Sequence, residues 1–124
     1  MSTPIIDEYG TKWYYNEQGQ LHRTDGPAVE YANGDKSWWV NDQRHRTDGP
    51  AVEYANGDKE WWVNGQLHRP DGPAIEYASG TKSWWVNGKC LTEAEFNAQY
   101  GQQQPSLEGA TITINGIDYI LNRK

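Results

Sequence analysis

The sequence has little of what a thick globular core or a disulfide scaffold requires. Cys90 is the single cysteine, so no disulfide can form within the chain and folding needs no oxidising compartment. Phe and Met occur once each, and Leu, Ile and Val are sparse. No apolar run approaches the roughly 18 residues of a membrane helix. The N-terminal residues show no basic segment followed by an apolar one, as a secretory signal would. We therefore expect a cytoplasmic protein with no membrane partner.

Basic residues are also fewer than acidic ones. The 124 residues include 17 acidic and 11 basic side chains, which gives a net charge of −6. This balance argues against binding to nucleic-acid backbone, which needs a basic face. An acidic DNA mimic is disfavoured too, because Lys and Arg are interleaved with the acids. The apolar content is supplied largely by 7 Trp and 8 Tyr, whose rings suit a thin sheet or solenoid by bridging neighbouring strands.

A 23-residue unit occurs three times in tandem, as a first copy (21–43), a second copy (44–66) and a third copy (67–89). The copies read LHRTDGPAVEYANGDKSWWVNDQ, RHRTDGPAVEYANGDKEWWVNGQ and LHRPDGPAIEYASGTKSWWVNGK. A fixed short period indicates one supersecondary unit stacked on copies of itself. Each residue type then forms a column, which is a surface for binding rather than a unique site for turnover.

Each copy contains the pattern of two strands and two turns. In the first copy, Pro27–Ala32 and Lys36–Asn41 flank Asn33-Gly34, a strong hairpin signal, and a second turn follows at Asn41-Asp42. A short extended segment at His22-Arg23 leads into an Asp-Gly-Pro turn. The pattern predicts a mainly all-β fold, a single-layer antiparallel β-hairpin repeat sheet or solenoid, with a short C-terminal helix and a terminal hairpin.

Two registers are open for the main hairpin. A two-residue loop at Asn33-Gly34 is the favoured one, and it places Val29, Tyr31, Trp38 and Val40 on the core face. A three-residue loop shifts the pairing by one and exchanges the roles of Trp38 and Trp39. In either register we expect one Trp of each pair to belong to the core.

The ends differ from the middle, as repeat arrays require. Thr92-Glu93-Ala94-Glu95 reads as a capping box that starts a helix, with Leu91 and Phe96 as a hydrophobic staple covering the last hairpin. We expect that helix to run to about Tyr100. The predicted divisions are an N-terminal cap and half-repeat (1–20), the three copies (21–89), a capping helix (90–101), a linker (102–109) and a C-terminal hairpin (110–124).

Three residue types recur at the repeat period and are candidates for a protein or ligand surface. They are Trp39, Trp62, Trp85, Arg23, Arg46, Arg69, His22, His45 and His68. Each Arg either pairs with a Glu across the sheet, at Glu30, Glu53 or Glu76, or binds an acidic partner or phosphate. The Trp ladder is either covered by its neighbours or a dimer partner, or is a protein-binding strip, or is a stacking platform for a base or sugar.

The His column does not predict a metal site. Equivalent residues of adjacent copies would lie two strand widths apart, roughly 10 Å, which is too far for one ion to join. The remaining interpretations are packing beside a Trp and contact with a ligand. The paired acids of the repeat recur from copy to copy, whereas an active site needs a unique constellation, so we expect no enzyme and no cofactor.

The repeated string G-P-A-x-E-Y-x-x-G-x-K-x-W-W-V-N-G-x resembles the MORN repeat variant family over roughly residues 9–96. The resemblance implies single-layer antiparallel sheets with about one hairpin per repeat. The HRxDGPA form with paired aromatics, closed by a segment like 89–96, is similar to small proteins of bacteriophages and large DNA viruses. A second segment, Lys12–Gly19, is similar to choline-binding or glucan-binding repeats.

The family resemblance, and not the residues alone, implies a function. The implied function is that of a phage accessory protein, active in the host cytoplasm, which binds and inhibits a host protein, such as one of its defences. The alternatives are capture of a nucleotide, sugar or choline between aromatic rings, and a structural homo-oligomer, for example a homodimer.

Overall fold

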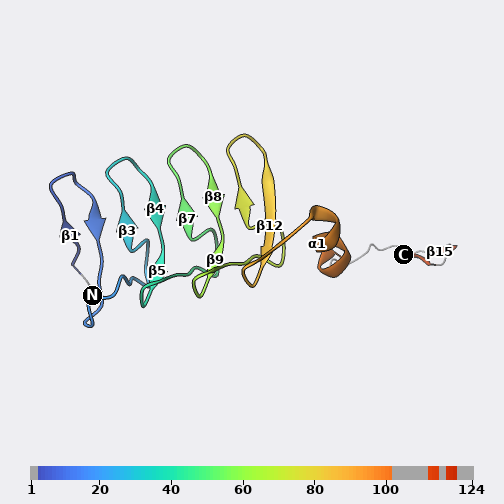
Figure 1. Ribbon diagram of the computed structural model, residues 1–124, viewed down its shortest axis with the longest axis horizontal. Coiled ribbons are helices and arrows are strands. Elements are labelled where there is room, and N and C mark those ends of the chain that lie inside the picture. Colours follow the sequence, from blue (N-terminus) through green and yellow to red (C-terminus); the bar gives the residue numbers. More distant parts are fainter. Residues whose placement is uncertain (1–2, 102–111, 115–116, 120–124) are drawn as a thin grey trace. The chain divides into compact units, whose positions relative to one another are not determined.

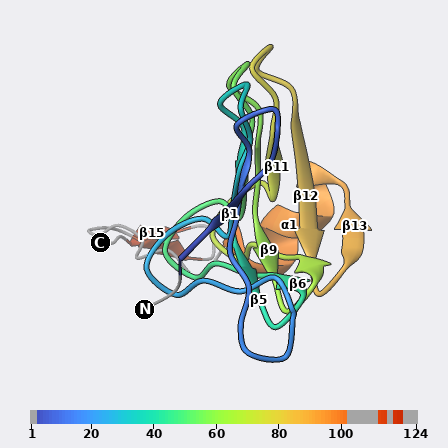
Figure 2. The ribbon, with the colours of Figure 1, turned by 90° about the vertical axis from the view of Figure 1, so that its left-hand side faces the viewer.

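The computed structural model describes residues 3–101, 112–114 and 117–119, and the chain divides into two compact units, Met1–Thr92 and Glu93–Lys124. The first unit contains all three copies as a row of hairpins (Figure 1). Seen along the row, successive hairpins overlie one another (Figure 2). The prediction of a mainly β fold built from antiparallel hairpins is confirmed.

One nine-stranded sheet joins the main hairpins, and its strands follow one another in chain order. All its pairings are antiparallel. The strands are β1 (Ile5–Ile6), β2 (Lys12–Trp13), β3 (Val29–Glu30), β4 (Lys36–Ser37), β7 (Val52–Glu53), β8 (Lys59–Glu60), β11 (Ile75–Glu76), β12 (Lys82–Val86) and β13 (Lys89–Leu91).

A smaller hairpin follows each main one. β5 (Trp39–Val40) pairs with β6 (Gln43–Arg44), and β9 (Trp62–Val63) pairs with β10 (Gln66–Leu67). In the third copy the long β12 pairs with β13 in the same way. The two-residue turns have left-handed backbone at both positions, with φ of 49° and 69° at Asn41 and Asp42. These are type I′ turns, at the place where the sequence predicts a second turn.

The favoured two-residue loop at Asn33-Gly34 is wrong, and the three-residue alternative is correct. Val29 pairs with Ser37, and the Tyr31 N–H donates to the Asp35 carbonyl at 2.9 Å. Of the Asn-Gly pair only Gly34 takes a positive φ, 100°. The Asn33 side chain instead accepts the Asp35 N–H at 2.9 Å. That local bond suits a type I turn followed by a bulged glycine, which competes with the type I′ turn for the same dipeptide.

The shifted register changes the expected core. Tyr31, placed on the core face by the two-residue loop, is 40% exposed. The most buried positions are small residues, Ala28, Ala51 and Ala74 at 0% and Val29 at 1%. Both Trp residues of every pair are half-buried, so the expectation of one core Trp per pair is also wrong. The Trp rings are therefore partly exposed to solvent.

Charged residues of alternating sign form a row across the sheet. Each is the direct cross-strand neighbour of the next. The row is Lys12, Glu30, Lys36, Glu53, Lys59, Glu76 and Lys82. Opposite charges across a strand pair contribute about 0.2–1 kcal/mol relative to Ala–Ala. The row therefore favours the observed register over slipped ones.

Side-chain acceptors connect the tips of adjacent hairpins. The Asp35 carboxylate accepts the Ala55 N–H at 2.7 Å, and Asp58 accepts the Ala78 N–H at 2.7 Å. The third copy has Thr81 at the position of these aspartates, where no further copy follows. The sequence change therefore matches the end of the stack.

The second unit contains the helix α1 (Glu93–Gln99), which begins directly after Thr92 as the capping box predicts. Phe96 is buried, at 5% exposure, and stacks with Tyr100 at 5.3 Å between ring centroids. β14 (Ile112–Ile114) pairs antiparallel with β15 (Ile117–Tyr119). The predicted linker lies outside the described residues, and coverage of the last hairpin by the helix stays a prediction. No helix in the described part of the chain has the length and apolar composition needed to cross a bilayer.

Two loop glycines allow the stability cost of backbone strain to be measured apart from the cost of a steric contact. Gly57 and Gly80 have φ of 102° and 98°, but only a Cβ at Gly57 would meet a neighbour, the Ala78 Cβ at 3.3 Å. We expect Gly80→Ala to lower the free energy of unfolding by about 1 kcal/mol through strain alone. Gly57→Ala should cost more. Urea denaturation measures both, and equal effects would contradict the described contact between hairpins.

Candidate interaction grooves

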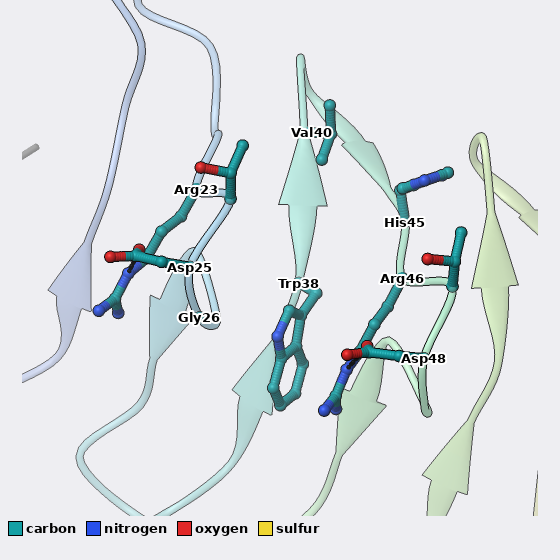
Figure 3. Close-up of a pocket in the computed structure, with 10 residues that line it drawn as sticks. Arg23, Asp25, Gly26, Trp38, Val40, His45, Arg46 and Asp48 are labelled. Atoms are coloured by element: carbon teal, nitrogen blue, oxygen red, sulfur yellow. Dashed lines mark hydrogen bonds and ion pairs between the residues drawn. The ribbon is translucent and has the colours of Figure 1, made fainter. Parts of the chain in front are cut away.

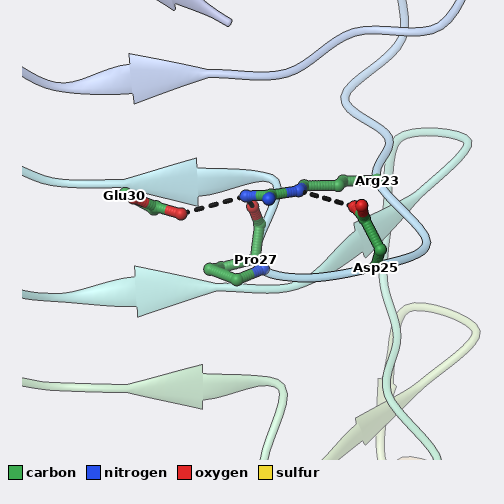
Figure 4. A network of polar contacts seen from close by, with 4 residues as sticks. All are labelled: Arg23, Asp25, Pro27 and Glu30. Atoms are coloured by element: carbon green, nitrogen blue, oxygen red, sulfur yellow. Dashed lines mark hydrogen bonds and ion pairs between the residues drawn. The ribbon is translucent and has the colours of Figure 1, made fainter. Parts of the chain in front are cut away.

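One arginine in each copy forms the centre of a polar network. In the first copy, Arg23 Nε donates to Asp25 at 2.8 Å, and Nη1 donates to the Pro27 carbonyl at 3.1 Å and to Glu30 at 3.0 Å (Figure 4). Arg46 and Arg69 repeat this network in the other copies, at 2.9–3.0 Å. The geometry thus corresponds to the predicted alternative in which each Arg pairs with a Glu.

The same guanidinium packs on an aromatic ring of the preceding unit. Arg46 lies 3.9 Å from the centroid of Trp38, and Arg69 lies 3.9 Å from that of Trp61. The Arg23 guanidinium packs on Tyr14, 4.0 Å from the ring centroid, so the degenerate N-terminal half-repeat supplies the equivalent ring. These distances are well within the range of cation–π attraction. Each Arg therefore connects its own copy to the one before it.

The Asp-Gly turn allows this close packing. A Cβ at Gly49 would stand 3.0 Å from Arg46 Cζ, and Gly26 and Gly72 are placed alike at 3.0 and 3.1 Å from their own Arg. Glycine therefore lets the guanidinium lie directly against the turn. The recurring Asp-Gly in the sequence supplies an ion-pair partner and this space together.

The network also shifts the pKa values of Arg23 and Asp25. Burial acts to lower the pKa of Arg23, but the hydrogen bonds with Asp25 and Glu30 outweigh it, so the pKa lies above its ordinary value. The pKa of Asp25 lies below its ordinary value of 3.8, first because Arg23 donates a hydrogen bond to it and then because of the guanidinium charge. Both groups therefore keep their charge at neutral pH.

The histidines make a hydrogen bond within their own copy. Nδ1 of His22, His45 and His68 accepts the backbone N–H of the first residue in the type I′ turn, at 3.2, 3.1 and 2.9 Å. Because Nδ1 is the acceptor in this contact, Nε2 is the ring nitrogen that can donate to another group. In the described residues no group of three or more His, Cys, Asp or Glu is placed to hold a metal ion.

Two equivalent grooves lie between successive Asp-Gly turns. The first, of about 510 Å³, is lined by Trp38, Val40 and His45 and flanked by the turns of Asp25 and Asp48 (Figure 3). The second, of about 710 Å³, repeats this lining with Trp61, Val63 and His68, between the turns of Asp48 and Asp71. Thr47 and Asp48 border both grooves. The repeat thus builds one groove twice.

The predicted binding residues are not brought together on one surface. Arg46 and His45 line the first groove with Trp38, whereas Trp39 and Trp62 line a different cavity of about 310 Å³. Successive residues of a strand point to opposite faces, which separates the two Trp columns. Nε1 of Trp39, Trp62 and Trp85 donates to Ser37, Glu60 and Ser83, respectively, at 2.7–2.8 Å.

Sequence reasoning therefore missed Trp38, Trp61 and the three turn aspartates as groove residues. The register of the main hairpin decides which Trp joins the His and Arg side chains. The three-residue loop, which the sequence also allows, takes Trp38 off the core face. The favoured two-residue loop assigned Trp38 to the core. The aspartates recur as regularly as the histidines, so their periodicity was a second signal.

The cavity beside Trp39 and Trp62 contains a departure from the repeat. Arg44 stands where the other copies have Leu21 and Leu67, with its Cζ 5.3 and 5.0 Å from the two Trp centroids. Its Nε is buried with no hydrogen-bond partner among the described residues.

Glu60 is the second departure, in place of a serine, and it accepts hydrogen bonds from Trp62 and, at 3.3 Å, from the Tyr54 hydroxyl. Burial, and then the charge of Glu60, raises the pKa of Tyr54. Arg44 and Glu60 therefore make the second copy the most charged of the three around the cavity of Trp39 and Trp62.

Comparisons with protein families, curated proteins and solved structures found no match. The resemblance to MORN repeat variants therefore stays a prediction, and the grooves are interpreted from their own chemistry.

The arginine network predicts a graded loss of stability in the second copy. Arg46→Ala removes the contacts to Asp48, Glu53 and Trp38 and should lower the free energy of unfolding by about 2 kcal/mol, with the exposed Asp48 contact discounted for solvent screening. Arg46→Lys should fall between wild type and Ala, because an ammonium cannot match the forked geometry. Urea denaturation followed by circular dichroism measures the series.

Asp48→Asn is the control, because it keeps the acceptor oxygen and should cost less than either Arg46 variant. An Arg46→Ala protein as stable as wild type would contradict the structural role of the network.

Proposed function

We propose that this chain is a non-enzymatic interaction module that binds a partner protein in the two grooves between its Asp-Gly turns. The observation that carries the proposal is the repetition of one groove, with the same Trp, Val, His, Arg and Asp lining, on both sides of the turn at Thr47 and Asp48. A partner segment that crosses this turn can occupy both grooves. Binding at the first then raises the effective concentration for the second.

The chemistry of the grooves supports binding rather than turnover. Each Arg is held by two carboxylates and a carbonyl, and each His Nδ1 by a backbone N–H. Groups held in this way are rigid and preorganised, which lowers the cost of ordering them on binding. Trp and Arg are also the side chains most often found at the energetic centre of protein interfaces.

The family resemblance adds a proposed partner. A chain of the phage type would bind a host protein, such as a component of a defence system, and block it by occupying its surface. This part of the proposal rests on the repeated sequence string, and the grooves supply the contact surface that it requires.

A bulky side chain at the shared border should block both grooves. Thr47 is exposed and borders both, so Thr47→Tyr should remove the partner protein captured from bacterial lysate by the tagged chain. Thr81→Tyr is the matched control, because Thr81 is exposed in a hairpin loop outside the linings of the two grooves. Quantitative mass spectrometry of the captured proteins measures the effect.

A protein captured equally by wild type and by both variants would contradict groove binding. Unfolding midpoints of the variants within a degree or two of wild type confirm that a loss of capture reflects blocking and not misfolding.

Small-ligand capture is the second candidate, because volumes of about 510 and 710 Å³ are within the range of known ligand pockets. Titration of the Trp fluorescence with nucleotides, sugars and choline tests it. If small ligands are the function, one of these should quench the fluorescence saturably, and Thr47→Tyr should weaken that binding. No saturable change with any of the compounds would exclude this candidate for them.

A further inference from the structure

The grooves have a charge, a lining and a spacing that together specify one kind of occupant. Resting on the proposed function, we infer that they bind an extended segment in the polyproline II conformation, with Lys or Arg at every third position. The first argument is charge. Asp25, Asp48 and Asp71 are exposed, with side-chain exposures of 70%, 83% and 82%.

The arginines are much less exposed than these aspartates. Each groove is lined by two Arg and two Asp side chains, but the Arg side chains are only 21–23% exposed, so the carboxylates are the charges that face solvent. A basic segment therefore complements the turns, and an acidic segment or a nucleic-acid backbone does not.

The aromatic lining is the second argument. Trp38 lines the first groove with Val40, and Trp61 lines the second with Val63. Each ring also has the guanidinium of the following copy 3.9 Å from its centroid. Proline-rich segments dock into aromatic-lined grooves in several recognition modules, because their backbone is already extended and loses little entropy on binding. The combination of a half-buried Trp in the lining with exposed Asp residues at the border suits a proline-rich segment that carries basic side chains.

The third argument is the match of two periods. Successive copies are two strands apart in the main sheet, so equivalent grooves repeat at roughly 10 Å. A polyproline II helix has three residues per turn and a rise of about 3.1 Å, so positions i and i+3 point the same way about 9.3 Å apart. A β-strand alternates with a period of two, and its i and i+3 side chains point to opposite faces. The groove spacing therefore favours polyproline II over an extended strand.

A set of synthetic peptides tests the inference on the full-length protein. The probe is a blocked nonapeptide of three Arg-Pro-Pro triplets. The controls are a nonapeptide of the same composition with Arg at every second position, one with Gly in place of Pro, and one with Glu in place of Arg. Isothermal titration at low ionic strength measures each dissociation constant. We expect the Arg-Pro-Pro peptide to bind at least fivefold more tightly than any control.

Charge-neutralising variants locate the binding. Asp48→Asn keeps the acceptor for Arg46 and should weaken the Arg-Pro-Pro peptide about threefold, as expected for a single exposed ion pair. Asp48→Asn combined with Asp71→Asn should weaken it about tenfold. Glu17→Gln removes one negative charge at an exposed residue outside both groove linings and should leave the affinity unchanged.

The inference is overturned if the Arg-Pro-Pro peptide does not bind, binds no more tightly than the every-second-position control, or is unaffected by the Asp48 and Asp71 changes. These results are distinguishable from failure of the proposed function. If Thr47→Tyr still abolishes capture of a partner protein, the grooves bind that partner through different chemistry. If Thr47→Tyr leaves capture unchanged, the grooves are not the contact surface at all.

Discussion

The rest of the repeat structure depends on one interaction, the guanidinium held between an Asp, a Glu and an aromatic ring. Arg46 pairs with acids of its own copy and packs on Trp38 of the preceding one, so one side chain sets both the local turn and the contact between copies. This matters because the buried side chains are mostly small, such as Ala28 and Val29. A thin sheet buries little apolar surface. The paired charges packed against half-buried rings therefore supply part of the stabilisation that a larger apolar core would give.

Contacts between neighbouring copies make the array behave as a stack. Backbone bonds such as Trp38 N–H to the Ala51 carbonyl, at 2.7 Å, are joined by the Asp35 carboxylate at the hairpin tips. Each copy therefore completes the hydrogen bonding of its neighbour, which is the nearest-neighbour logic of repeat proteins. At the ends the sequence changes accordingly, with Tyr14 as the first ring and Thr81 where no further copy of the repeat follows.

The two sides of the smaller hairpins have different chemistry. On one side the groove lining recurs almost unchanged, with Trp38 and Trp61 at equivalent places. On the other side Arg44 occupies the space between Trp39 and Trp62, and Glu60 accepts the Trp62 N–H. The groove side therefore keeps the repeat, whereas the opposite side contains the substitutions, Glu60 with a hydrogen bond to Trp62 and Arg44 with a buried Nε that has no partner among the described residues.

The sequence by itself determined the repeat, the antiparallel hairpins, the position of the second turn and the start of the helix at Glu93, because these follow from local turn chemistry and a strict period, and it offered the Arg–Glu pairs as one of two alternatives. Only the tertiary structure decided which Trp of each pair joins the His and Arg residues. Asn33-Gly34 is compatible with two loops that differ by one residue, and that difference turns every later side chain to the other face. The choice rests on the Asn33 side-chain bond and on pairing with the neighbouring copies, neither of which a residue pattern contains.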